Sequence, residues 1–124
     1  MNEVSDRYPL GNLEDLEEGG ARGFLTNDDG NDVFFVVKSD GQLFGWRNAC
    51  PHINGAPMAW RKDAYMNSAK SYVCCHAHGA LFEPKTGLCI QGPCLGQRLK
   101  KIVICVDAEG NASVSRTDLE KNKN

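Results

Sequence analysis

The chain has 124 residues, enough for one domain with little room for a second. A chain of this size can build one core and has no mass left for a separate catalytic module. Its formal net charge of −2 gives no indication of nucleic-acid binding.

The sequence predicts a cytoplasmic protein that does not enter a membrane. Its N-terminal segment has no basic stretch followed by an apolar run, so we expect no signal peptide. The longest apolar runs, Val33–Val37 and Ile102–Val106, hold five residues each, whereas a membrane-spanning helix needs roughly 20.

Charge is divided unevenly along the chain. Residues 1–32 carry nine acidic and two basic side chains, whereas residues 33–104 carry three acidic and nine basic ones. The acidic N-terminal segment is therefore a candidate for packing against, or neutralising, the basic middle, which holds all three histidines.

The predicted elements are short and begin with a single helical turn. The leucines at positions 10, 13 and 16 have the spacing of such a turn, which the Gly19-Gly20 pair would end. The β-branched and aromatic run Val33–Lys38 follows. The turn residues Ser39-Asp40-Gly41 then separate it from Gln42–Trp46, which predicts a β-hairpin.

The second half of the chain continues as short strands. The predicted strands are Tyr72–Cys74, Ala80–Glu83, Leu99–Asp107 and Ala112–Ser115. Leu99–Asp107 becomes continuously apolar, as expected of a well-buried strand. No pattern of period 3.6 persists over three turns, so the chain is predicted to be all-β, a sandwich or a barrel. We expect one domain over residues 1–116 and a disordered polar tail over 117–124.

Six cysteines in a short chain are compatible with a disulfide framework or with metal binding. A disulfide framework requires a secreted, oxidising setting, of which the sequence gives no sign. In a reducing cytosol, the cysteines are better interpreted as metal ligands or as small buried hydrophobic residues.

Two cysteine–histidine motifs are the strongest signal in the chain. They are Cys50-x-His52 and Cys75-x-x-His78, separated by 22 residues. Each pairs one thiolate with one imidazole in a loop after a predicted strand. The four ligands suit either a [2Fe–2S] cluster or a zinc ion. Zinc sites rarely divide their ligands into two such pairs, so the cluster is the preferred hypothesis.

This donor set has an electrostatic consequence. An oxidised cluster with four thiolates carries a net charge of about −2, and replacing two thiolates by neutral imidazoles makes it neutral. An electron is added more easily to a neutral centre. The reduction potential therefore rises from roughly −400 mV to a range of about −150 to +300 mV.

With these motifs and the residues that flank them, the sequence resembles the Rieske family. The similarity runs from about Phe34 to Val114 and includes the segments HGALF and TGLCIQGPC. The resemblance implies the Rieske fold, an antiparallel β-sandwich base with a smaller cluster-binding subdomain, here about residues 47–95. It also implies one [2Fe–2S] cluster per chain.

The resemblance assigns the ligands by position. Cys50 and Cys75 would bind the inner iron, and His52 and His78 would bind the outer iron near the surface. The Gly92-Pro93 segment would form a third loop that covers the cluster.

Departures from the high-potential Rieske proteins favour the low-potential, ferredoxin-like branch. The high-potential proteins join the ligand loops by a disulfide, and the corresponding residues here are Gly55 and Ala77. They also place hydroxyl donors near the cluster, where this chain has Ala80 and Phe82. The 22-residue separation of the motifs is longer than is usual in dioxygenase ferredoxins, which favours a different subgroup.

The remaining candidate residues have plainer interpretations. His76 is expected to be an exposed loop residue. Cys74 should point away from the site, because neighbours in a strand face opposite sides. Cys74, Cys89, Cys94 and Cys105 are expected to be packing residues. Structural roles are also expected for the acidic residues at 14, 15, 17 and 18, in a solvated turn. Trp46 and Trp60 are expected to lie in the core or at the base of a loop.

Counting the histidines favours an electron carrier over an enzyme. A Rieske oxygenase needs a second iron site with two further histidines, and only His76 remains. No nucleotide-binding glycine motif follows a strand. We therefore predict a monomer or weak oligomer that carries one electron between a reductase and a terminal oxygenase or another redox enzyme.

Two alternatives from other classes stay open. The chain could be the Rieske-like small subunit of a larger oxidoreductase such as nitrite reductase, although it keeps all four ligands, which such subunits can lack. It could also be a redox-sensing module that regulates a partner, although the sequence contains no effector domain. Co-purification from the native host would distinguish a carrier from a fixed subunit.

Overall fold

The structure is a computed structural model that describes residues 7–25, 32–49, 65–67, 69–75 and 79–115. Within these ranges the chain forms ten β-strands and no α-helix, which confirms the predicted all-β class. No helix in this part of the chain is long and apolar enough to cross a membrane. The predicted tail over residues 117–124 lies outside the described residues.

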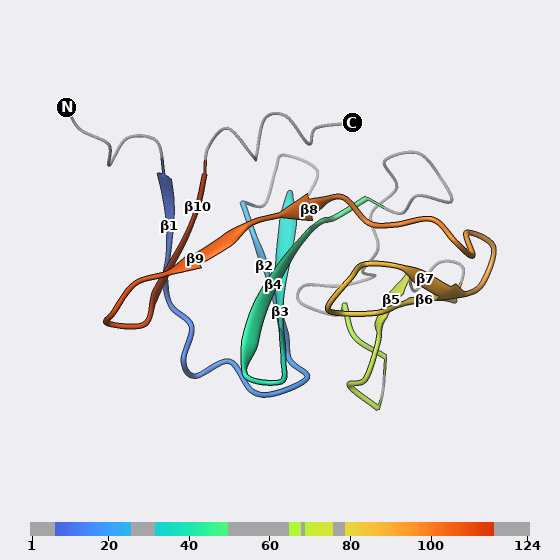
Figure 1. Cartoon of the computed structure of the whole chain (residues 1–124), viewed down its shortest axis with the longest axis horizontal. Helices are drawn as coiled ribbons and strands as arrows, with labels where there is room; N and C mark the ends of the chain where they lie inside the picture. The colour runs from blue at the N-terminus through green and yellow to red at the C-terminus, as the bar shows by residue number, and fades with distance from the viewer. Residues whose placement is uncertain (1–6, 26–31, 50–64, 68, 76–78, 116–124) are drawn as a thin grey trace.

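The strands form three antiparallel sheets, which follow one another across Figure 1. The first sheet contains, in order, β1 (Arg7–Asn12), β10 (Asn111–Ser115) and β9 (Ile104–Val106). The second contains β2 (Ala21–Phe24), β3 (Phe34–Ser39), β4 (Gln42–Arg47) and β8 (Lys101–Ile102). The third contains β5 (Val73–Cys75), β6 (Ala80–Phe82) and β7 (Cys89–Gln91). We call the first two sheets the base and the third the small sheet.

Strand β3 separates two hydrophobic clusters, because side chains along a strand alternate between its faces. Phe34 and Val36 belong to the base cluster, which also holds residues of β8 and β10. Phe35 and Val37 belong to the joining cluster, which connects the base to the small sheet. All four side chains are fully buried, so the continuous apolar run forms a strand that is covered on both faces.

The predicted hairpin is confirmed by the pairing of β3 with β4, in which Ser39 lies opposite Gln42. Asp40 and Gly41 form its two-residue turn with φ angles of 54° and 75°, the left-handed conformation that such turns require. The Glu18 carboxylate accepts hydrogen bonds from both turn amides, at 2.6 and 3.0 Å. One member of the acidic N-terminal run therefore caps this turn.

The predicted helical turn near the N-terminus does not form. Leu10 belongs to β1, because that strand pairs with β10. The Leu16 amide donates to the Leu13 carbonyl at 3.0 Å in an isolated turn that buries both leucines. Beyond this turn, Glu17 forms an ion pair with Lys70, so the acidic segment contacts the basic middle of the chain here.

The single strand predicted over Leu99–Asp107 is divided between two sheets. Strand β8 pairs with β4, whereas β9 pairs with β10, and Val103 lies between them. Val103 and Val106 remain 48% and 53% exposed. The prediction of one well-buried strand is wrong, because the chain changes its pairing partner at Val103. An apolar run does not encode such a change.

Candidate metal centre

The small sheet fixes the position of Cys75 at the end of β5. In its register Cys75 lies opposite Ala80. The Gly79 amide donates a 2.7 Å hydrogen bond to the Cys75 carbonyl, which closes a tight connection between β5 and β6. Gly79 has a φ of 73°, a left-handed conformation that glycine adopts without strain. The second Cys/His motif therefore starts from a constrained backbone.

Cys74 and Cys75 differ in burial, as their alternation along a strand predicted. Cys75 is fully buried in the joining cluster, whereas Cys74 is half-buried. Burial raises the pKa of the Cys74 thiol. The fold thus distinguishes two thiols that are adjacent in the sequence.

The structure describes one of the four predicted ligands, Cys75. Cys50, His52 and His78 lie outside the described residues, as does His76. Across the described ranges, no group of three or more His, Cys, Asp or Glu side chains could hold a metal ion. The site is therefore defined here by Cys75 and by the residues that anchor the ligand-bearing segments.

Asp32 anchors the chain on both sides of the segment that contains Cys50 and His52. Before that segment, the Asn48 side-chain amide donates to the Asp32 carbonyl at 2.9 Å. After it, the Tyr65 hydroxyl donates to the Asp32 carboxylate at 2.7 Å. Asp32, Asn48 and Tyr65 are all buried. The two ends of the first ligand segment are therefore held by one residue.

Tyr65 also links this anchor to the small sheet. Its ring stacks on Phe35 with a centroid distance of 4.0 Å, and its carbonyl accepts a 2.8 Å hydrogen bond from the Cys74 amide. Neither Asp32 nor Tyr65 carries a sequence signal for this role. They are 33 positions apart and belong to no motif, so only the three-dimensional structure reveals their contact.

Tyr65→Phe should destabilise the folded protein by about 1–3 kcal/mol, because it removes a donor from a buried carboxylate and keeps the stacked ring. Urea unfolding would measure this loss. Tyr72→Phe is the matched control, because Tyr72 is only half-buried and belongs to a surface connection. We expect it to change stability by less than about 0.5 kcal/mol. Equal losses in the two variants would contradict the anchoring role.

Gly92 brings the predicted third loop against the small sheet. Its φ is 110°, and a Cβ at this position would lie 2.7 Å from the Ala80 Cα. Ala80 lies opposite Cys75 in the small sheet. The loop that contains Pro93 therefore begins close to Cys75, a ligand candidate. The family resemblance implied a covering loop at this position.

Trp46 supports the turn between β6 and β7. Its indole Nε1 donates to the Pro84 carbonyl at 3.0 Å, and a Cβ on Gly87 would lie 2.8 Å from the indole ring. Trp46 is 2% exposed, which confirms its predicted place in the core. Trp60 lies outside the described residues.

The packing role predicted for the other cysteines is confirmed for Cys89 and Cys94, which are 1% and 0% exposed. It is wrong for Cys105, which is exposed on β9. Strand β9 lies at the edge of its sheet, beside β10 only, and its last two residues, Cys105 and Val106, are exposed.

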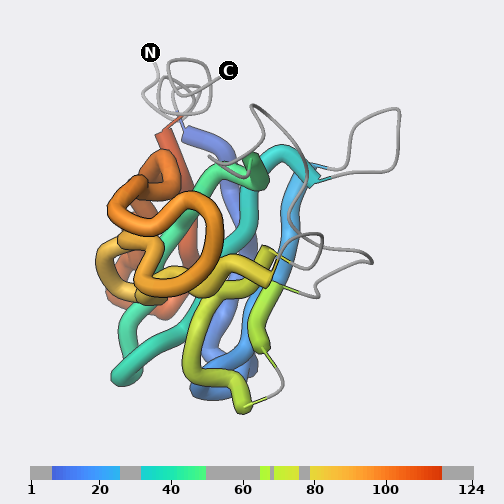
Figure 2. Tube along the Cα trace, turned by 90° about the vertical axis from the view of Figure 1, so that its right-hand side faces the viewer, coloured from blue at the N-terminus to red at the C-terminus, as the bar shows by residue number. Residues whose placement is uncertain are grey.

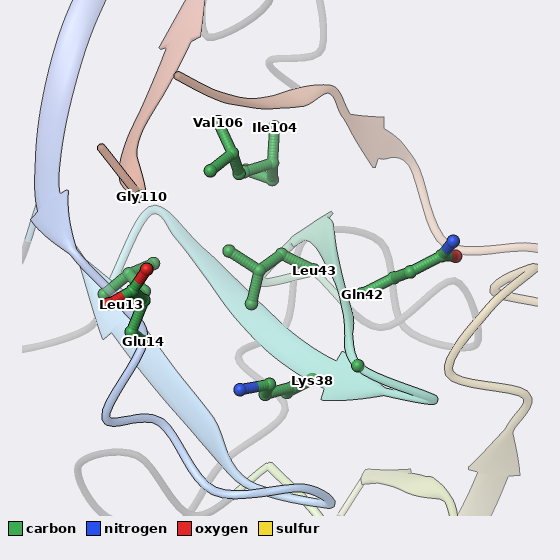
Figure 3. Close-up of a pocket in the computed structure, with 9 residues that line it drawn as sticks. Leu13, Glu14, Lys38, Gln42, Leu43, Ile104, Val106 and Gly110 are labelled. Atoms are coloured by element: carbon green, nitrogen blue, oxygen red, sulfur yellow. The ribbon is translucent and has the colours of Figure 1, made fainter. Parts of the chain in front are cut away.

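A groove of about 440 Å³ opens on the base (Figure 3), and Cys75 is not among the residues that line it. Its lining residues come from the base strands and their connections, with Leu43 and Ile104 among the apolar ones. Glu14 and Lys38 contribute charged groups of both signs. The groove therefore adds nothing to the candidate metal centre.

The described residues form a small all-β fold, and the sequence adds two Cys/His motifs of the kind that bind metals. The Rieske [2Fe-2S] domain matches residues 6–114, which is most of the chain. The chain therefore belongs to the Rieske [2Fe-2S] domain family. A search of curated proteins found no match.

Solved structures share the fold at low sequence identity. The ferredoxin of carbazole 1,9a-dioxygenase from Nocardioides aromaticivorans matches with a TM-score of 0.62 and 24% identity, over 86% of this chain and 96% of that chain. A chain in a complex of reduced oxygenase and oxidized ferredoxin of carbazole 1,9a-dioxygenase matches with a TM-score of 0.66 and 19% identity, over 89% and 93%. At these identities the likeness establishes the fold.

The residues present fit the family's [2Fe–2S] cluster. Cys75 offers a thiol in an apolar setting, at a tight connection whose backbone is fixed. The sequence supplies one further Cys/His motif and a second histidine after Cys75, so two thiolates and two imidazoles can be assembled.

Proposed function

We propose that the protein carries single electrons between a reductase and a terminal oxygenase or another redox enzyme. The family match over residues 6–114, in a chain with four ligand candidates, is the observation that carries this proposal. The similar structures include ferredoxins of an oxygenase system, which supports the same role.

In this proposal Cys50 and Cys75 hold one iron, and His52 and His78 hold the other. When bound, the cluster supplies a centre that accepts and returns one electron. The chain contributes the surroundings of that centre. The joining cluster buries Cys75, and the anchors described above hold the described residues that flank the two ligand segments.

We further propose that residues 1–116 form a single domain that works in the cytoplasm, with its cluster-binding subdomain at about residues 47–95. Its partners would be redox proteins, with no role for nucleic acid or a membrane. A carrier must release each partner quickly, so each contact should bury less than about 1,200 Å² in total. A monomer or weak oligomer leaves the site free for such contacts.

The purified protein should be red-brown and contain two irons and two acid-labile sulfides per chain. The two Cys/His motifs provide the required ligands. Metal and sulfide analysis, combined with a reductive titration, should give one electron accepted per chain. Stoichiometric zinc without acid-labile sulfide would contradict both the cofactor and the proposed function.

The carrier role itself is tested by electron transfer to a second protein. The reduced protein should be reoxidised by an oxygenase or reductase from the same host and should dissociate from it afterwards. Permanent co-purification with a large catalytic subunit would instead identify a fixed subunit of that enzyme.

The midpoint potential should lie near the bottom of the Rieske range, at about −150 mV. Ala80 and Phe82 are fully buried in the joining cluster and carry no hydroxyl that could donate to the site. Ala80→Ser should raise the potential, because it adds a donor opposite Cys75. Ala112→Ser, the same change in the base cluster, should leave it unchanged. Voltammetry that gives a wild-type potential above zero near neutral pH would contradict the low-potential assignment.

A further inference from the structure

Cys89 and Cys94 bring two thiols into contact outside the predicted ligand set. Their Sγ atoms lie 3.3 Å apart, with the Cys94 thiol donating to the Cys89 sulfur. The Cys89 thiol in turn donates to the Gln91 carbonyl at 3.3 Å. We propose that this pair is a reversible dithiol–disulfide site, which exchanges two electrons and two protons with low-molecular-weight disulfides such as oxidised glutathione.

The backbone already holds the two cysteines in position for this bond. The Cys89 amide donates to the Gln97 carbonyl at 2.8 Å, and the Cys89 carbonyl accepts from the Gly96 amide at 3.1 Å. The chain after β7 therefore folds back beside that strand (Figure 2). A disulfide of about 2.05 Å requires the sulfurs to approach by about 1.3 Å. Side-chain rotation can supply this movement while β7 keeps its pairing with β6.

The pair is distinct from the sites considered so far. Cys75 belongs to the same joining cluster, yet the described side chains include no group of three that could hold a metal ion. The loop-joining disulfide of high-potential Rieske proteins corresponds to Gly55 and Ala77 in this sequence, so the Cys89–Cys94 contact is a different one.

Access to the pair is through the loop that carries Cys94. Cys94 is the one buried residue among exposed neighbours over residues 91–98. Two backbone hydrogen bonds lie within this loop, from the Leu95 amide to the Gly92 carbonyl at 3.2 Å and from the Gln97 amide to the Cys94 carbonyl at 2.8 Å. The two bonds of Cys89 described above tie the loop to β7 and would have to open with it. A short exposed loop opens at far lower cost than the whole domain. Cys94 is therefore the first thiol that a reagent meets.

The chemistry balances as two thiol–disulfide exchanges. The Cys94 thiolate attacks one sulfur of oxidised glutathione, which forms a mixed disulfide and releases one glutathione thiolate. The Cys89 thiolate then attacks the Cys94 sulfur, which closes the protein disulfide and releases the second glutathione. The protein gives up two electrons and two protons, and glutathione takes up both.

Closing this bond fixes the third loop relative to the small sheet. Gly92, at the start of the loop, packs against Ala80, which lies opposite Cys75. The proposed bond therefore constrains the chain directly beside the candidate metal centre. The amides of Gly96 and Gln97 should exchange hydrogen more slowly in the oxidised protein than in the reduced one.

The test uses the whole chain of 124 residues as purified. The protein is equilibrated in glutathione buffers of fixed composition, quenched with acid, alkylated and digested with trypsin. Cleavage after Lys85 and Arg98 releases residues 86–98, whose only cysteines are Cys89 and Cys94. In the oxidised protein we expect this peptide to carry no alkyl group and to weigh two hydrogens less than the unmodified dithiol peptide. The fraction of closed peptide should depend on the square of the reduced glutathione concentration divided by the oxidised glutathione concentration. This dependence arises because closing one disulfide consumes one oxidised glutathione and releases two reduced ones. Dithiothreitol should restore both thiols.

Three variants provide the controls. Cys74→Ala and Cys105→Ala should leave the conversion unchanged, whereas Cys94→Ala should abolish the lighter peptide. The wild-type peptide decides the proposal even if a variant does not fold. If it keeps two alkylated thiols at every buffer ratio, or carries glutathione on either cysteine and never closes, the proposal is overturned.

Discussion

Cys75→Ser should abolish assembly of the cluster, whereas Cys74→Ser at the neighbouring position should leave it nearly complete. Cys75 is one of only two predicted thiolate ligands, and a serine hydroxyl is a poor substitute for a thiolate at iron–sulfur sites. Cys74 faces the opposite side of β5 and is only half-buried. Iron content, acid-labile sulfide and visible absorption of the purified variants would measure the difference.

The two variants control for each other, because each replaces a cysteine sulfur by a serine oxygen and the two positions are adjacent in one short strand. Far-ultraviolet circular dichroism should show the same strand content in both. Cys50→Ser should behave like Cys75→Ser, since it removes the other predicted thiolate. A colourless Cys74→Ser together with a coloured Cys75→Ser would mean that the wrong member of the pair has been chosen.

Local patterns account for the parts of the fold that the sequence predicts well. The hairpin follows from Asp40-Gly41, which supply the left-handed turn between two apolar runs. The burial of Cys75 and the lesser burial of Cys74 follow from alternation along a strand. In both cases the physical cause lies within a few residues of the predicted feature, so it is visible in the sequence.

Long-range contacts account for the rest. The Asp32–Tyr65 hydrogen bond joins residues 33 positions apart, and neither residue has a local signal that names the other. The change of sheet at Val103 depends on which strands are available as partners, which an apolar run does not record. The family resemblance predicted a third loop at Gly92, but its contact with Ala80 emerges only when the small sheet is assembled.

Gly92→Ala should destabilise the protein more than Gly96→Ala, a matched change at another glycine of the same loop. Both glycines have positive φ angles, 110° and 89°, so an alanine costs roughly 1–2 kcal/mol at either position. At Gly92 the added Cβ would also lie 2.7 Å from the Ala80 Cα, whereas nothing lies within 4 Å of the Cβ at Gly96. We expect a further loss of about 1–3 kcal/mol for Gly92→Ala, as in other overpacked sites.

The obstacle at Gly92 is backbone, and the Ala80 backbone is paired with Cys75 across the small sheet, so the loop must be displaced. Displacement should uncover the candidate metal centre, and the cluster of Gly92→Ala should therefore be lost to an iron chelator several times faster than that of Gly96→Ala. Urea unfolding and bleaching of the visible absorption would measure the two effects separately. Equal stability and equal bleaching rates in the two variants would show that the contact between the third loop and β6 does not protect the site.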